Sequence, residues 1–138
     1  MINVFDIGTQ GPPGAQGAQG PAGAARTFVA AQAISGHTVV ALNLAGKAVP
    51  ASADVAAHAF NIMGMTTNAA AANDLLTVID TGAVEELGWS WTAGLPLFLG
   101  LDGAITQDPR VGVFSKPVGM ALTSTKVVFQ LQPAVFLN

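Results

Sequence analysis

Few residues of this chain have the types and spacing that catalysis or metal binding requires. Its two histidines, His37 and His58, are far apart in the sequence, and the chain contains no cysteine. Because transition-metal sites combine several His, Cys or carboxylate ligands, we interpret both histidines as hydrogen-bonding residues at a surface or an interface. Glu85 and Glu86 are neighbours, and neighbouring residues of a strand point to opposite faces. They are therefore not expected to work as a paired acid and base.

The remaining polar residues give no stronger signal for a reaction. Asp102 and Asp108 lack the dense oxygen-ligand spacing of a calcium loop and are more typical of turns. The sequence has neither a glycine-rich phosphate loop ending in Gly-Lys nor a Gly-x-Ser-x-Gly turn of serine hydrolases. We therefore predict that the protein is not an enzyme and carries no cofactor and no metal.

Two tryptophans form the one aromatic pair that could bind a ligand. Trp89 and Trp91 are two residues apart, so on a strand both would project from the same face. Such a pair could be a platform on which a sugar ring stacks, or it could pack in the core or at a subunit interface. Few neighbouring polar residues could hold sugar hydroxyls, so packing is favoured and glycan binding remains the alternative.

The most regular feature of the sequence is a glycine at every third position near the N-terminus. A collagen triple helix winds three chains around an axis so crowded that only glycine fits there. A flexible Gly/Ala/Pro linker is the alternative, but it has no reason to space its glycines evenly. The period predicts a collagen-like triple-helical stalk over residues 8–25 and a homotrimer. The expected axis residues are Gly8, Gly11, Gly14, Gly17, Gly20 and Gly23.

Residues 26–138 have the pattern of a small all-β domain. Short runs of β-prone residues alternate with turn residues about every ten positions, which predicts a β-sandwich or barrel that also holds the three chains together. We expect a first hairpin formed by Thr27–Ile34 and His37–Leu42. The other expected strands are Ala59–Thr66, Leu75–Asp80, Glu86–Trp91, Leu95–Leu99, Val118–Thr123 and Lys126–Gln132.

A weak internal repeat supports this prediction. Phe60–Thr67 is similar to Lys116–Thr123, and each is followed by a second β-rich run, which indicates two similar hairpins in a pseudo-repeated sheet. Each copy contains a glycine in mid-strand, at Gly64 and Gly119. A bulge or a close approach of two backbones is the usual reason for such a glycine.

Composition limits the partners of the chain. Its 138 residues allow one domain with a short appendage, and 51% are hydrophobic while 9% are charged, against roughly 25% charged in typical domains. So apolar a surface predicts extensive coverage by partners. The net charge is −3 with scattered cations, so no nucleic-acid partner is expected. No apolar run approaches the about 20 residues of a membrane span, and no membrane partner is expected.

One stretch of the sequence resembles small virion proteins of tailed bacteriophages. The resemblance rests on GWSWTAGLPLFLG at residues 88–100, DGAITQ at 102–107 and VGMAL at 118–122, about a third of the chain. Modules of this kind occur in capsid decoration (cement) proteins, head fibres and tail-fibre heads, often beside collagen-like triplets. The resemblance implies a structural protein of the virion, trimeric assembly and no catalysis.

Within the virion, a capsid location is the leading hypothesis. The chain is short for a receptor-binding fibre, and a charge-poor surface suits contact with a shell. We expect a decoration or head-fibre trimer on the capsid surface, made in the host cytoplasm, with the major capsid protein as its partner. A tail-fibre or spike module that binds a host glycan is the alternative. Residues 1–7 are β-prone and could add as an edge strand to a capsid protein. The candidate anchoring residues are Ile2, Val4, Phe5 and Ile7.

Overall fold

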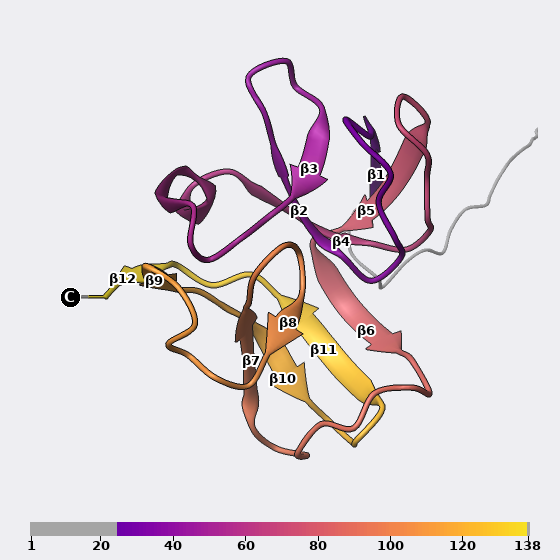
Figure 1. Ribbon diagram of the computed structural model, residues 1–138. Helices are drawn as coiled ribbons and strands as arrows, with labels where there is room; N and C mark the ends of the chain where they lie inside the picture. Colours follow the sequence, from indigo (N-terminus) through magenta and orange to yellow (C-terminus); the bar gives the residue numbers. More distant parts are fainter. Residues whose placement is uncertain (1–24, 138) are drawn as a thin grey trace, which may run out of the picture.

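Strands dominate the part of the chain that the computed structural model describes, residues 25–137 (Figure 1). This part contains twelve strands and one short 3-10 helix, η1 (Ala56–Ala59), which confirms the all-β class predicted from the sequence. None of its elements is an apolar helix long enough to cross a membrane. The strands are β1 (Ala25–Val29), β2 (Val39–Leu42), β3 (Ala48–Pro50), β4 (Ile62–Thr66), β5 (Leu75–Ile79), β6 (Thr81–Glu85), β7 (Pro96–Leu99), β8 (Ile105–Thr106), β9 (Phe114–Ser115), β10 (Pro117–Ala121), β11 (Lys126–Gln130) and β12 (Val135–Phe136).

The two large sheets have the same strand order. One sheet runs β1-β5-β4-β2-β3 and the other runs β6-β11-β10-β7-β8. The strands β6, β7, β8, β10 and β11 therefore repeat the arrangement of β1 to β5, and Figure 1 shows the two sheets one above the other. We call β1–β5 the first repeat and the matching five strands the second repeat. Strands β9 and β12 form a separate two-stranded ladder.

Each repeat carries a β-bulge at the glycine that the sequence singled out. In the first repeat Val40 pairs with Gly64 and Ala41 with Ile62, so Met63 is the extra residue. The second repeat has its register shift between Pro117 and Gly119. A Cβ atom on Gly64 or Gly119 would collide with a carbonyl oxygen of the neighbouring strand, Ile79 or Val128. The predicted bulge, close approach and pseudo-repeat are all confirmed.

The repeats pack through opposite faces. We call the face with Met65 or Met120 the front of its repeat, and the other face, with Val40 or Leu97, the back. Met65 pairs with Val39 and Ile79, while Met120 holds the same position between Pro96 and Val128. The main core joins the front of the first repeat to the back of the second. Its members include Val39, Ala41, Met65, Leu97, Val127 and Phe129.

A loop covers the back of the first repeat. Val40 lies in a second core cluster together with Ile34 and Leu76, all from the first repeat. The backbone N–H and carbonyl groups of Ile34 and Ala70 bond to each other, with both N···O distances 2.9 Å, which holds the β1–β2 loop against the β4–β5 loop. The centre of the first repeat's sheet, around Val40 and Met65, is thus buried on both faces.

Two sequence predictions of local structure are wrong. The expected hairpin of Thr27–Ile34 with His37–Leu42 does not form, because β1 pairs with β5 and the residues between β1 and β2 are the loop over the back of the sheet. The expected strand Glu86–Trp91 is also wrong, since β6 ends at Glu85 and a turn follows. Strand β1 begins at Ala25, the last residue of the range expected to form the stalk.

Candidate functional site

Trp89 and Trp91 lie in the loop between β6 and β7, not on a strand. Backbone hydrogen bonds hold this loop, because the N–H of Trp89 donates to the Glu86 carbonyl at 3.0 Å and the N–H of Trp91 donates to the Ser124 carbonyl at 2.8 Å. The ring centroids are 5.9 Å apart with a tilt of 54°. Both rings are half-buried and pack against the main core. The strand geometry predicted for them was wrong, and the choice between an interface and a glycan platform stays a prediction.

His37 brings a polar side chain from the first repeat to this aromatic pair. Its ring centroid is 5.2 Å from that of Trp89, and its Nδ1 is 3.7 Å from Oε1 of Glu86. The backbone of His37 has a positive φ of 58°, and its N–H donates to the Thr66 carbonyl at 2.9 Å. A tight turn thus fixes the imidazole where the two repeats meet.

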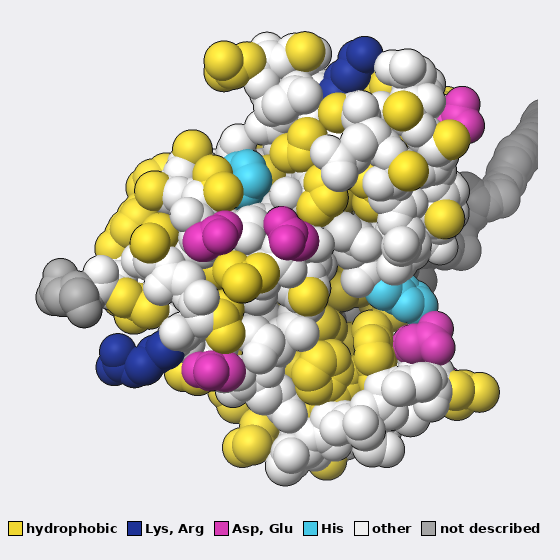
Figure 2. Space-filling model, viewed as in Figure 1, with side chains coloured by type: hydrophobic (Ala, Val, Ile, Leu, Met, Phe, Trp, Pro, Cys, Tyr) yellow, Lys and Arg dark blue, Asp and Glu magenta, His cyan; other side chains and the backbone are white. Residues whose placement is uncertain are grey.

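Together these residues line a hollow of about 400 Å³. Figure 2 shows a histidine and an acidic side chain next to each other on the right of the molecule, beside hydrophobic side chains exposed between its upper and lower parts. Oε2 of Glu86 accepts a hydrogen bond from the N–H of Gly88 at 3.1 Å, which leaves Oε1 facing His37. The lining residues are Gly36, His37, Glu86, Trp89, Trp91, Ala104 and Ile105.

The hollow has the components of a site for a neutral ligand with hydroxyl groups. Tryptophan faces supply stacking surface, while the carboxylate of Glu86 and the imidazole of His37 supply hydrogen-bonding groups. Within the described residues, Nε1 of Trp91 is a buried donor without a hydrogen-bond partner. Sequence reasoning missed the roles of His37 and Glu86, because about fifty residues separate the two and only the packing of the repeats brings them together.

The other polar residues that the sequence singled out have structural contacts. Nδ1 of His58 accepts a hydrogen bond from the N–H of Ser52 at 3.0 Å. Burial lowers the pKa of His58, and the nearby Asp54 carboxylate partly opposes this shift. Asp102 has a positive φ of 53° in a turn, and Oδ1 of Asp108 caps the N–H of Arg110 at 2.9 Å. The turn roles predicted for these two aspartates are confirmed.

Several predicted site residues lie outside the described part of the chain. They are the six stalk glycines (Gly8, Gly11, Gly14, Gly17, Gly20 and Gly23) and the four anchoring residues Ile2, Val4, Phe5 and Ile7. Across residues 25–137 there is no group of three or more His, Asp or Glu side chains placed to hold a metal ion. Neither a protein-family model nor a curated protein matches this chain.

Proposed function

We propose that this chain is a structural protein of a tailed-phage virion, a homotrimer of the capsid decoration or head-fibre type that binds and stabilises the shell. The observation that carries the proposal is the run of six glycines at exact three-residue spacing, directly before a duplicated β domain. That spacing has a physical reason only where three chains share an axis. The chain is proposed to act through binding and not through catalysis.

The surface of the β domain supports a role in assembly. Many large hydrophobic side chains are exposed on it. Soluble monomeric domains rarely expose large continuous apolar patches. Phe60 and Phe136 are 81% and 47% exposed, and their ring centroids are 5.7 Å apart. Figure 2 shows hydrophobic side chains gathered on the left, where β9 and β12 lie in Figure 1. Contact with a shell would remove such surface from water.

The amount of the protein in purified particles tests this proposal. Quantitative gel densitometry of virions should give the chain in a fixed, high ratio to the major capsid protein, and immunogold labelling should mark the head. A ratio far below that of the major capsid protein, with label on the tail, would contradict the capsid assignment. The label on the tail would then favour the second candidate function.

Recognition of a host-surface glycan is the second candidate function. The hollow with Trp89, Trp91, His37 and Glu86 favours it, because stacked aromatic rings beside hydrogen-bonding groups suit a sugar. A glycan array probed with the full chain should then show binding that Trp89→Ala abolishes. Leu44→Ala is a matched control, because Leu44 is fully exposed in the β2–β3 turn. Equal binding by the wild type and Trp89→Ala would exclude the hollow as the glycan site.

A further inference from the structure

Two methionines in equivalent positions have opposite environments. Met65 stands between Val39 and Ile79 in the first repeat, and Met120 stands between Pro96 and Val128 in the second. Met65 is fully buried, whereas 43% of Met120 is exposed. The strand order and bulge are shared, so the difference lies in what covers each front face.

The cause is the way the repeats stack. The front of the first repeat packs against the back of the second, and the loop with Ile34 covers the back of the first. When two similar units stack front to back, the front of one unit has no partner within the pair. Here that surface is the front of the second repeat.

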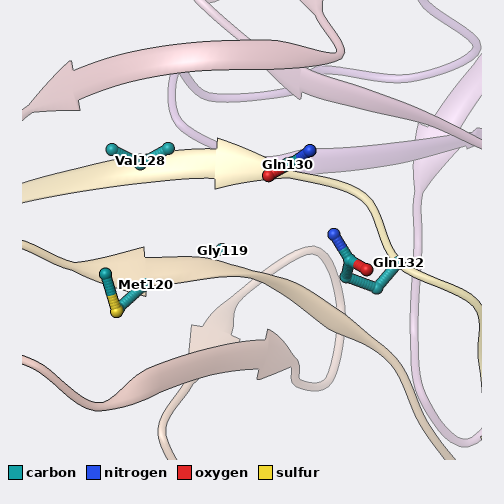
Figure 3. Close-up of a pocket in the computed structure, with 5 residues that line it drawn as sticks. All are labelled: Gly119, Met120, Val128, Gln130 and Gln132. Atoms are coloured by element: carbon teal, nitrogen blue, oxygen red, sulfur yellow. The ribbon is translucent and has the colours of Figure 1, made fainter.

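This open front is apolar at its centre and polar at its ends. Its central side chains are Ala83, Pro96, Phe98, Met120 and Val128, and none of them is charged. Figure 3 shows Met120 and Gly119 on β10, Val128 and Gln130 on β11, and Gln132 just beyond, around a hollow of about 280 Å³. The paired Glu85 and Lys126 mark one end of the face. Such an apolar centre with a polar rim is typical of a protein interface.

The position of the glycine triplets indicates which partner covers it. The glycine triplets begin at Gly8 and run up to the start of the domain at Ala25, the first residue of β1. Ala25 pairs with Ile79, and β6 starts two residues later at Thr81. Strand β6 is the edge of the sheet that carries the open front. Three chains that share an axis at Ala25 would therefore hold three such edges close together.

We propose that the open front of the second repeat is the contact between copies of this chain, with the three faces meeting around the axis set by the stalk. This inference rests on the proposed trimer and goes beyond it, because it identifies the surface through which the copies contact one another. The central side chains of this face then supply the burial that holds the chains in register. A collagen-like segment of six triplets needs such support, because its stability grows with the number of triplets wound together.

A thiol reporter can test the surface in the full chain. The chain has no cysteine, so Met120→Cys and Leu44→Cys each introduce a single thiol at a position that is exposed in one copy. We expect a maleimide to label the Met120→Cys variant at least tenfold more slowly than the Leu44→Cys variant. Circular dichroism should first show that both variants keep the wild-type fold.

The outcomes separate this inference from the proposed function. Native mass spectrometry of the wild type comes first, and a single-chain mass would overturn both the trimer and the contact. A trimer in which both thiols react equally fast would overturn only the contact, and would favour another surface such as the patch with Phe60 and Phe136. A trimer with a protected thiol at position 120, which becomes reactive when dilution lowers the mass to that of one chain, supports it.

Discussion

The two repeats share a strand order and a bulge, and in both of them the loop after the first strand is hydrogen-bonded to a later loop of the same repeat. They differ in what covers their faces. At the centre of the first repeat's sheet both faces are buried, by the second repeat on the front and by the Ile34 loop on the back. In the second repeat the back is buried and the front, with Met120, is open. Two such sheets have four faces, and one chain covers the centres of only three of them.

The loops that follow β1 and β6, which we call the capping loops, also differ between the repeats. In the first repeat the β1–β2 loop bonds to the β4–β5 loop through Ile34 and Ala70. In the second repeat the β6–β7 loop bonds to the β10–β11 loop through Trp91 and Ser124. A shared backbone position thus holds an isoleucine in one repeat and an indole in the other. Each of the two loops lines a hollow, but only the hollow at the second loop contains aromatic and charged side chains.

The largest loss of stability is expected at the two bulge glycines, and it tests whether both repeats depend equally on their bulge. Gly64→Val and Gly119→Val each place a side chain against a carbonyl oxygen of the next strand, and each should destabilise the domain by about 3 kcal/mol or more. Gly46→Ala is the control, because Gly46 has a positive φ of 77° but open space around it, and should cost about 1 kcal/mol. Urea denaturation measures all three. A tolerated valine at one bulge only would break the equivalence of the repeats.

The second effect separates the two front faces. Met65→Ala removes a fully buried side chain and should lower the free energy of unfolding by about 2–5 kcal/mol. Met120→Ala should leave the fold of a single chain almost unchanged, and its cost should appear in the association of copies. Thermal unfolding over a range of protein concentrations distinguishes the two. A large, concentration-independent loss for Met120→Ala would show that this methionine is covered within its own chain.

A third test compares the capping loops. Ile34→Ala removes a side chain that is 4% exposed, and should cost about 2–4 kcal/mol because the back of the first sheet loses its cover. Trp91→Ala should cost less, about 1–3 kcal/mol, because the indole is only half-buried. Guanidinium denaturation gives both values. If the Trp91→Ala variant were the less stable of the two, the hollow would be more deeply packed than its exposure indicates.

The smallest expected effect is the acid sensitivity of the first repeat. Burial holds the pKa of His58 below its ordinary value of 6.5, so the unfolded chain binds a proton more readily than the folded chain. The resulting contribution to stability is present above pH 6.5 and is lost as the pH falls below it. Stability measured at pH 7.5 and 5.0 should differ more in the wild type than in His58→Gln. An equal difference in both would assign the acid sensitivity to other groups.

The sequence predicted those parts of the fold that depend on local chemistry. Strands β2, β4, β5, β7 and β11 lie within predicted β runs, and β10 overlaps one. The glycines at 64 and 119 correctly indicated bulges. The prediction failed where pairing is non-local. Ser35-Gly36 has hairpin chemistry, but Phe28 pairs with Leu76 of β5, which is a partner that no local pattern reveals.

The candidate site was predictable only in part. Trp89 and Trp91 were found from their spacing, but the Gly-Trp-Ser-Trp segment alternates like a strand and is a loop, because β6 ends at Glu85. The contribution of His37 depends on the packing of the first repeat against the second. The open front was hidden for the same reason, since Met65 and Met120 have similar sequence surroundings and differ only in what lies over them.

Sedimentation equilibrium of the full chain and its Met120→Glu variant shows whether three copies meet through the open front. A glutamate at this position would place three carboxylates around the shared axis, which strongly disfavours association. We expect a mass of three 13.9 kDa chains for the wild type and of one chain for the variant. Equal masses for the two proteins would contradict this expectation.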